Sequence, residues 1–503
     1  MDESGITPNN SNQQLLENGD NDSATTLLQS KSSRRRDEFS SVTPAEYLTV
    51  GILCFINLIN YMDRFTIAGV LGDIQTDFSI GDDRAGLLQT VFVVAYMVFA
   101  PIFGYLGDRY SRRYIMAFGV ALWSITTLAG SFMTTFPTFA FFRCLVGVGE
   151  ASYSTIAPTI ISDLFLGNLR SKMLAVFYFA IPVGSGMGYI VGSLTASAAN
   201  DWRWALRVTP FLGAAAVLLI VFLMNDPERG QAEHSHMKAT SYGEDLKSLM
   251  KNPSFMLSTI AFTCVSFVTG ALAWWGPKYI FLGLGLQNDS ISEADVSYKF
   301  GLVAMFAGTL GVPLGSWLAT KLRSSIADCD PLICAFALLA SAPLIFLSLV
   351  AVQINVVLTY ILIFLGEITL NLTWSIVADM LLYVVVPPRR STAEAFQILI
   401  SHMFGDAGSP YLIGVISETL KRSLTPSSQE EVTSFVKFKS LQYALFVTCF
   451  VEVLGGIFFL ATAMYIVRDK NKADRAIAGY YTPIHSVAGC PATGTYEKAL
   501  RIS

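Results

Sequence analysis

Residues 104–113 read Gly-Tyr-Leu-Gly-Asp-Arg-Tyr-Ser-Arg-Arg and stand at the junction of two long apolar runs, 84–107 and 113–133. Each run is long enough to cross the hydrocarbon core of a bilayer as a helix. Basic residues close to the ends of spanning helices favour the cytosolic side of a membrane. The stretch therefore predicts a polytopic membrane protein with this loop in the cytosol.

The composition of the chain points to the same class. Of the 503 residues, 52% are hydrophobic and only 14% are charged, whereas soluble proteins carry about a quarter charged residues. With a mean hydropathy of +0.50, the chain has too few polar side chains to cover a water-exposed surface, so lipid must face much of it. The 34 basic and 38 acidic residues nearly balance, which gives no indication of a nucleic-acid partner.

Twelve apolar runs extend from the basic loop in both directions, six on each side of a polar linker at 227–252. The predicted spans are 47–71, 84–107, 113–133, 136–164, 171–197, 204–224, 254–283, 298–321, 331–352, 355–385, 392–420 and 437–467. We therefore predict an all-α membrane protein with two six-helix halves, 44–226 and 253–468. The polar ends are predicted to be cytosolic tails, 1–43 being disordered and 469–503 closing the chain.

The two predicted halves share a pattern of polar residues. Gly149-Glu150 and Arg170-Ser171 recur as Gly366-Glu367 and Arg390-Ser391. The offset between mates drifts only from 216 residues, at Asp163 and Asp379, to 222 residues, at Gly192 and Gly414. Internal repeats of this kind are typical of transporters, so the pattern favours two parallel halves around a central cavity.

Lysines and arginines near the span ends predict the orientation. They gather on one side of the predicted topology, at 31–36, 109–113, 170–172, 321–323, 389–390 and 468–472. That side, with both termini, is predicted to be cytosolic. Asn288-Asp289-Ser290 falls on the opposite side, so Asn288 is a candidate glycosylation site. The seven cysteines show neither a disulfide framework nor the spacing of a metal site.

Residues 104–113 resemble the signature loop of the major facilitator superfamily, Gly-x-Leu-Gly/Ala-Asp-Arg/Lys-x-Gly/Ser-Arg/Lys-Arg/Lys, and fit it at every specified position. A degenerate copy at 315–323 lacks the acid. The resemblance implies a major facilitator fold, in which this loop latches the halves together on the cytosolic side in the outward-facing state.

The predicted latch consists of seven residues: Asp108, Arg109, Arg112, Arg113, Asp163, Ser391 and Glu394. Asp108 is expected to lie against the positive end of span eleven, where residues 391–394 have the pattern of a capping box. Arg112 is expected to reach Asp163. The alternative is that the basic residues only anchor the topology.

Four longer stretches resemble the Spinster family of that superfamily: 60–65 (Asn-Tyr-Met-Asp-Arg-Phe), 147–158, 177–186 and 404–414. The resemblance implies a lipid transporter. One branch of the family exports lysophospholipids from lysosomes with proton coupling, and another exports sphingosine-1-phosphate from cells. Residues 389–398 look more like the lysosomal branch.

Charged side chains inside the predicted spans indicate where the mechanism lies, because an ionised group at mid-bilayer is costly unless it is paired or hydrated. Asp63 adjoins Arg64 in span one, and Arg143 and Glu150 share one face of span four. Span ten holds Glu367, and span eleven holds His402 and Asp406, four residues apart.

These residues receive two predicted roles. Arg143 and Arg64 are expected to pair with a phosphate headgroup, because a guanidinium matches phosphate oxygens, and Asn371 and Trp374 to line the cavity. Glu150, Asp63, His402 and Glu367 are candidates for proton coupling. Each has a structural alternative: an ion pair between Arg143 and Glu150, a helix cap at 63–64, and a hydrogen-bonded core histidine at His402.

We therefore predict a transporter that moves lysophosphatidylcholine and lysophosphatidylethanolamine out of the lysosome or late endosome by alternating access. It would use the proton gradient and no cofactor. A monomer in the bilayer is expected, with sorting adaptors as candidate partners of residues 481–484, which have the Tyr-x-x-bulky form. The alternatives are a plasma-membrane exporter of sphingosine-1-phosphate or sphingosine and a lipid-sensing receptor. An enzyme is disfavoured, because the four histidines form no paired metal ligands and no nucleophile motif is present.

Overall fold

The computed structural model describes residues 42–165, 167–227, 242–287, 291–386, 389–425 and 433–481, and within these ranges every regular element is a helix. Ten of the described helices are long and apolar enough to cross a membrane. The helix Arg112–Gly130 and the interrupted segment Arg390–Leu424 complete the predicted set of twelve. The expected all-α fold is confirmed.

Local sequence explains where several helices begin. The first half comprises α2 (Pro44–Gly69), α3 (Leu71–Phe78), α4 (Asp82–Arg109), α5 (Arg112–Gly130), α6 (Phe136–Leu164), α7 (Gly167–Ala199) and α8 (Ala205–Leu223). A capping box starts α2, in which the Thr43 side chain accepts from the Glu46 backbone and the Glu46 carboxylate accepts from the Thr43 backbone at 2.8 Å.

The second half follows the short linker helix α9 (Tyr242–Met250). It comprises α10 (Pro253–Gly285), α11 (Glu293–Leu322), α12 (Cys329–Ala351), α13 (Val356–Asn371), α14 (Thr373–Val384), α15 (Arg390–Ser401), α16 (Gly408–Leu424) and α17 (Ser434–Tyr481). Asn252 caps α10 and Asn355 caps α13, each accepting from a backbone N–H three residues on. Span ten is thus two helices, and span eleven is interrupted by a π-helical turn at His402–Asp406.

The structure corrects one expectation about a helix start and shows helical structure in two segments predicted as tail and linker. The helix α15 begins at Arg390 after Arg389, so Ser391 lies inside the helix and does not cap it. The helix α17 continues to Tyr481, so the segment predicted as a tail from 469 begins as helix. The predicted linker contains α9, which is held by an ion pair from Arg389 to Asp245 at 2.9 Å.

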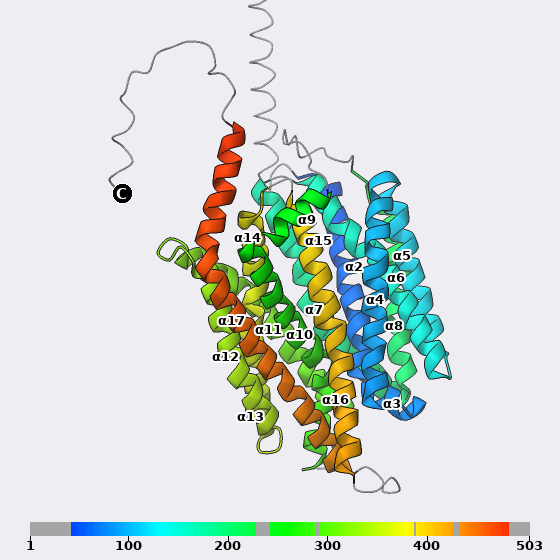
Figure 1. The fold of residues 1–503 in the computed structure, drawn as a ribbon. Coiled ribbons are helices and arrows are strands. Elements are labelled where there is room, and N and C mark those ends of the chain that lie inside the picture. The colour runs from blue at the N-terminus through cyan, green and yellow to red at the C-terminus, as the bar shows by residue number, and fades with distance from the viewer. Residues whose placement is uncertain are drawn as a thin grey trace, which may run out of the picture.

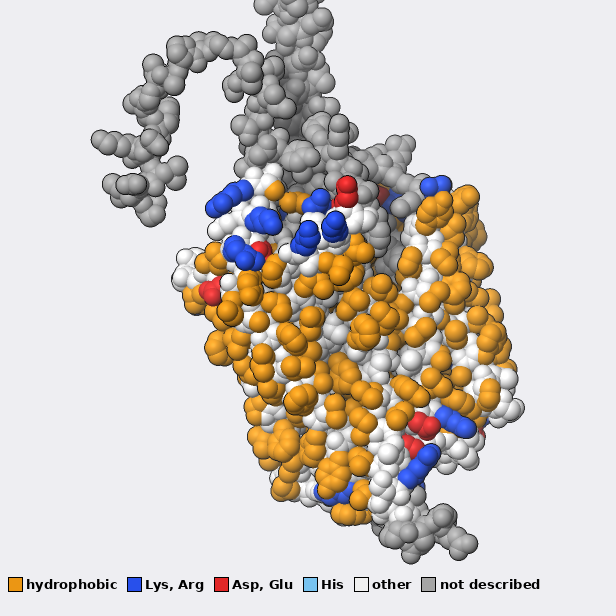
Figure 2. All heavy atoms as spheres, viewed as in Figure 1, with side chains coloured by type: hydrophobic (Ala, Val, Ile, Leu, Met, Phe, Trp, Pro, Cys, Tyr) orange, Lys and Arg blue, Asp and Glu red, His pale blue; other side chains and the backbone are white. Residues whose placement is uncertain are grey.

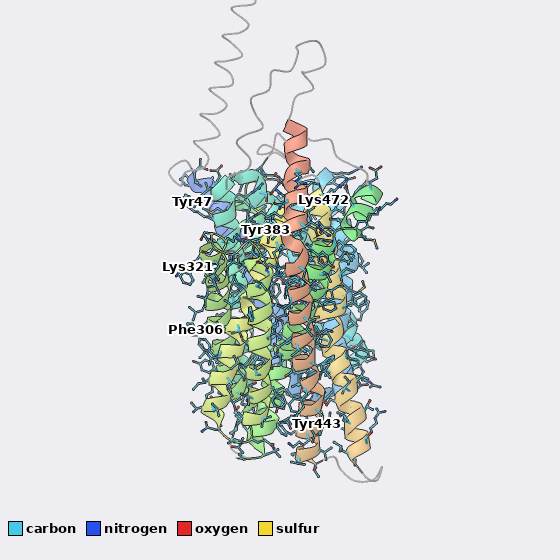
Figure 3. All side chains as sticks on the ribbon, turned by 60° about the vertical axis from the view of Figure 1, so that its left-hand side comes forward. Tyr47, Phe306, Lys321, Tyr383, Tyr443 and Lys472 are labelled. Atoms are coloured by element: carbon cyan, nitrogen blue, oxygen red, sulfur yellow. The ribbon has the colours of Figure 1, made fainter. Side chains whose placement is uncertain are left out.

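The two halves lie side by side: in Figure 1 the helices α3 to α6 and α8 lie on the right and α11 to α14 and α17 on the left, with α2, α7, α10, α15 and α16 between them. The start of α2 and the end of α17 lie at one end of the bundle, which we call the terminal face; α3 lies at the opposite end, the far face (Figure 1). Lysines and arginines gather at the terminal face, above a broad hydrophobic surface (Figure 2). Figure 3 places Lys321, Tyr383 and Lys472 toward the terminal face and Tyr443 toward the far face.

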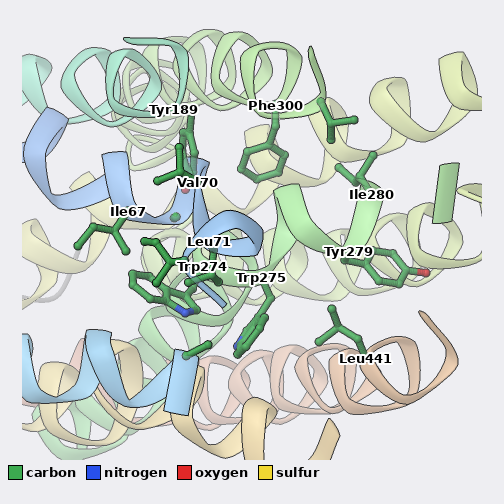
Figure 4. Close-up of a cluster of buried hydrophobic side chains, with 14 of the residues drawn as sticks. Ile67, Val70, Leu71, Tyr189, Trp274, Trp275, Tyr279, Ile280, Phe300 and Leu441 are labelled. Carbon is green, nitrogen blue, oxygen red and sulfur yellow. The ribbon is translucent and has the colours of Figure 1, made fainter. Parts of the chain in front are cut away.

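A buried hydrophobic cluster joins the two halves near the far face (Figure 4). It combines Leu71 and Tyr189 of the first half with Trp274, Trp275 and Phe300 of the second. The Tyr189 hydroxyl donates to the Ala273 carbonyl at 2.5 Å, across the halves. The far face is therefore closed by packing as well as by the polar contacts described below.

The internal repeat predicted from the sequence has a counterpart in side-chain contacts. Arg112, at the start of α5, forms an ion pair with Asp163 at the end of α6, as expected. In the second half Arg323, after α11, pairs with Asp379 of α14 at 2.9 Å. Because Asp163 and Asp379 are repeat mates, the same bridge ties the junction between the second and third spans to the fourth span in each half.

Close helix packing in the first half yields a stability prediction. A Cβ on Gly147 of α6 would lie 2.2 Å from the Phe92 carbonyl oxygen of α4, so Gly147→Ala must displace a backbone. We expect it to destabilise the protein by about 1–3 kcal/mol, the cost of overpacking. Gly51→Ala in α2 is the matched control, because its Cβ meets nothing within 4 Å. Thermal melting of the purified variants checks this; equal melting temperatures would contradict it.

Candidate functional site

Charged side chains from three helical segments meet in the middle of the bundle. Two come from α2, two from α6 and two from the π turn before α16: Asp63, Arg64, Arg143, Glu150, His402 and Asp406. Asp63, Glu150 and Arg143 are almost fully buried, with 1%, 2% and 3% of their surfaces exposed. Their contacts divide them into three groups.

The first group is built around Asp63. Its carboxylate lies 3.9 Å from Arg143 Nη1 and accepts hydrogen bonds from the hydroxyls of Thr127, at 3.2 Å, and Thr209. All four side chains belong to the first half. The arrangement gives the buried Asp63 a counter-charge and two donors, and it fixes the position of Arg143.

The second group is Glu150 with Asn60 of α2. With its amide nitrogen turned toward the acid, Asn60 donates to Glu150 Oε1 at 2.5 Å and Oε2 at 3.0 Å. The ion pair between Arg143 and Glu150, left open by the sequence, is not formed. The step of seven residues from Arg143 to Glu150 corresponds to a rise of about 10 Å, so the two share a helix face without meeting.

The third group crosses between the halves. Arg64 Nη2 of α2 lies 2.7 Å from Asp406 Oδ2, and His402 Nδ1 lies 2.8 Å from Asp406 Oδ1. Arg143 Nη2 donates to the backbone carbonyl of Arg64 at 3.3 Å. The guanidiniums of Arg64 and Arg143 also lie 5.2 and 4.2 Å from the centroid of the Phe92 ring, which favours cations at its face. The two arginines are therefore neighbours with separate carboxylate partners.

The π turn explains how His402 and Asp406 reach this position. Gly405 departs from helical geometry, with φ −92° and ψ −105°, and the Ala407 N–H donates to His402 O at 2.9 Å, five residues back. The Ala407 carbonyl accepts from Thr90 of α4 at 2.6 Å. Such wide turns inside helices are frequent at functional sites.

Contacts between α4 and the α15–α16 segment run from the far face up to the site. They include Gly86, where a Cβ would lie 2.3 Å from the Pro410 carbonyl, and the Tyr96 and His402 rings, 5.8 Å apart. Beyond that level, toward the terminal face, Ile102 of α4 and Leu399 of α15 are exposed. A furrow runs between the halves on the face shown in Figure 2. The bundle is thus closed at the far face and opens toward the terminal face.

Three predicted residues of the second half lie apart from the arginines. Glu367 lines a cavity of about 30 Å³ between α10, α11, α12 and α13, and its backbone carbonyl accepts from the Asn371 side chain at 2.8 Å. The Trp374 ring packs edge-on against Phe262, 5.1 Å away. Within the described residues, no hydrogen bond, ion pair or ring contact joins these three to Arg64 or Arg143.

The predicted latch is only partly visible. Arg112 also binds Asp226 at 3.1 Å and the Pro227 carbonyl, so these contacts lie within the first half and the first residue of the linker. The Arg109 and Arg113 guanidiniums lie over the rings of Tyr105 and Tyr114, and Glu394 is exposed. The side chains of Asp108 and Ser391, together with Asn288 and residues 482–484, lie outside the described residues.

Sequence reasoning missed several partners of the site. No sequence pattern distinguishes four of them from ordinary packing residues: Asn60, Phe92, Thr127 and Thr209. Glu452 did carry one, as an acid inside an apolar run. It is fully buried in α17, with Oε1 lying 2.9 Å from the Ser341 hydroxyl.

Comparison with known proteins defines the class first. The family model of the Major Facilitator Superfamily matches residues 53–410. The fold matches the crystal structure of a bacterial homologue of the human lysosomal transporter Spinster, in its inward-facing and unoccupied conformation, with a TM-score of 0.75 and 19% identity; the match covers 85% of this chain and 99% of that one. The chain is a member of the major facilitator superfamily, and hence a transporter, not an enzyme.

Two curated relatives identify the family within this superfamily. Protein spinster of Drosophila melanogaster is 58% identical over 483 residues, covering 87% of this chain and 80% of the relative. Protein spinster homolog 1 of Homo sapiens is 53% identical over 446 residues, covering 86% and 83%. Within the superfamily, the chain belongs to the Spinster family.

Proposed function

We propose that this chain exports lysophospholipids such as lysophosphatidylcholine from the lysosome lumen, driven by protons, by alternating access. The observation that supports this most directly is the pair of neighbouring arginines at mid-bilayer, Arg64 and Arg143, at the closed end of the opening toward the terminal face. A buried guanidinium pair is suited to a phosphate, while the acyl chain can lie along apolar helix faces. The similarity of the fold to a bacterial homologue of a human lysosomal transporter supports the location.

The two arginines differ in how easily a phosphate could reach them. Arg143 is 3% exposed and shares its carboxylate with two threonine hydroxyls. Arg64 is partly exposed, and its partner Asp406 belongs to the other half. We therefore assign Arg64 to the first contact with the headgroup and Arg143 to holding the site positive; Asp63 positions Arg143.

Proton coupling is assigned to two places. The Asn60 amide can donate to an ionised Glu150 or, turned over, accept from a protonated one, so either state of this acid keeps a partner. His402 and Arg64 both contact the Asp406 carboxylate. A change in the charge of His402 would therefore alter the strength of the ion pair between Asp406 and Arg64. Both changes would alter the affinity for a phosphate.

The location and orientation complete the proposal. The terminal face, with its lysines and arginines (Figure 2), is assigned to the cytosol, and the far face to the lumen. The protein would act as a monomer in the lysosomal or late endosomal membrane, sorted through residues 481–484. Glycosylation of Asn288 would mark the luminal side.

The test is flux in proteoliposomes that contain the purified protein, with lysophosphatidylcholine and sphingosine-1-phosphate compared under an imposed pH gradient. We expect flux of the lysophospholipid that depends on the gradient. Preferred transport of sphingosine-1-phosphate would favour the plasma-membrane alternative, and binding without flux would favour a receptor. Loss of the protein from cells should cause lysophospholipids to accumulate in lysosomes.

Glu150→Gln sharpens the same assay, because glutamine copies the shape of the protonated acid and cannot titrate. We expect the variant to bind lysophosphatidylcholine while its flux no longer varies with the pH gradient. The matched control is Glu46→Gln in the first turn of α2, away from the site. An unchanged pH profile for Glu150→Gln would move the proton role to His402.

A further inference from the structure

One buried carboxylate holds the far face closed. Asp82, in the first turn of α4, has a side chain that is 1% exposed. Its Oδ1 accepts from Lys278 Nζ of α10 at 2.7 Å and from the Gln75 amide at 3.0 Å. Its Oδ2 accepts from Lys421 Nζ and from the Ser417 hydroxyl, at 2.8 Å, both on α16. Four donors therefore converge on a single carboxylate.

The donors belong to different halves. Gln75 and Asp82 lie in the first half, and Lys278 also donates to the side-chain amide oxygen of Gln75. Lys278, Lys421 and Ser417 lie in the second half. Glu418 of α16 accepts from Lys421 at 3.3 Å and from the Asp82 backbone at 3.3 Å. Two lysines thus face two carboxylates while the far face is closed.

Opening of the far face would separate these partners. Asp82 and Gln75 would leave with α3 and α4, while Lys278, Lys421 and Ser417 would remain on α10 and α16. Lys278 and Lys421 would then keep Glu418 of α16 and, at longer range, Glu293 of α11 as their acidic neighbours. Once Asp82 has left, the donors of Lys278, Lys421 and Ser417 no longer bind its carboxylate and are suited to another oxyanion. Lysine is a common phosphate ligand.

We propose that Lys278, Lys421 and Ser417 form a phosphate-binding site for the lipid headgroup in the far-face-open state, and that Asp82 fills this site when the far face closes. The proposal rests on the proposed function, since it takes the substrate to carry a phosphate. Substrate phosphate and Asp82 compete for the same lysines. Substrate at the far face therefore favours the open state, and closure transfers the headgroup from the lysines toward Arg64.

Distance measurements test the competition without relying on transport. Spin labels at the exposed positions 76 of α3 and 419 of α16, in a background without native cysteines, report the opening of the far face in nanodiscs. Lysophosphatidylcholine should shift the wild type toward long distances. A monoacylglycerol with the same chain, which has no phosphate, should not.

Two sets of variants separate a phosphate site from a simple lock. Asp82→Asn and the double variant Lys278→Ala/Lys421→Ala should both populate long distances without lipid, because each removes the closing contacts. Only the double variant should raise the KM for lysophosphatidylcholine, by about tenfold or more, since it alone loses charged donors to the phosphate. Lys299→Ala is the control, because Lys299 forms an exposed pair with Asp295 within α11.

The outcomes are distinct. Equal KM values for Asp82→Asn and the lysine variant, or an equal distance response to both lipids, would overturn the phosphate site while leaving lysophospholipid transport intact. A wild type whose distances respond to lysophosphatidylcholine but which does not transport it would overturn the proposed function and leave the site standing.

Discussion

Arg143→Ala is expected to abolish the binding and transport of lysophosphatidylcholine and to destabilise the first half. The variant removes the cation beside Asp63 and leaves that carboxylate buried with only the Thr127 and Thr209 hydroxyls. Breaking a buried pair in this way costs about 3–5 kcal/mol. Binding to the purified protein and its melting temperature are the measurements.

A second substitution separates the two effects of losing Arg143. In Arg143→Ala/Asp63→Asn the unpaired charge is gone, so the melting temperature should return toward that of the wild type while binding stays lost. Arg143→Lys keeps the charge but not the two-pronged geometry, and it should retain partial binding. Normal transport by the double variant would remove Arg143 from the substrate site.

Reversing one charge of the Arg64–Asp406 pair is expected to stop transport completely. Arg64→Asp or Asp406→Arg places like charges where opposite charges now lie 2.7 Å apart, on either side of the contact between the halves. Each single variant should fail to hold the far face closed, because the side chains at positions 64 and 406 then carry like charges and repel each other. The two-label distance measurement across the far face, described above, reports this together with flux.

The exchanged pair Arg64→Asp/Asp406→Arg restores the attraction but moves the arginine to the second half, away from Arg143. Closure should recover, with a coupling free energy of about 1.5 kcal/mol or more in the double-mutant cycle, whereas lysophosphatidylcholine flux should stay low. Additive effects of the two reversals would show that Arg64 and Asp406 do not act as a pair. Arg203→Asp, at a far-face pair with Asp77, is the matched control.

Features that depend on neighbouring residues could be predicted from the sequence alone. Apolar length determines which segments span the bilayer, so the twelve spans and the two halves follow from local composition. The repeat placed Asp163 and Asp379 at equivalent positions, and each meets an arginine that lies between the second and third spans of its half. The charged residues of the site were also recognised, because a charge in an apolar run is conspicuous.

The choice of partners depended on the tertiary structure. Periodicity places Arg143 and Glu150 on one face of α6. Because α2 lies beside that face, Arg143 pairs with Asp63 and Glu150 with Asn60. Arg64 meets Asp406 across 342 residues of sequence, and a π turn that hydropathy does not reveal brings His402 to the same carboxylate.

The far face shows the difference most clearly. Asp82 and Lys421 lie just outside the predicted spans and Lys278 lies near the end of one, and the sequence analysis singled out none of the three. They become a buried cluster because the two halves close over them. The sequence by itself determined the spans, the repeat and the family, since these depend on length, composition and local order. The packing of the two halves decided which charges pair and which end of the bundle is closed. That packing joins residues that no local sequence pattern relates.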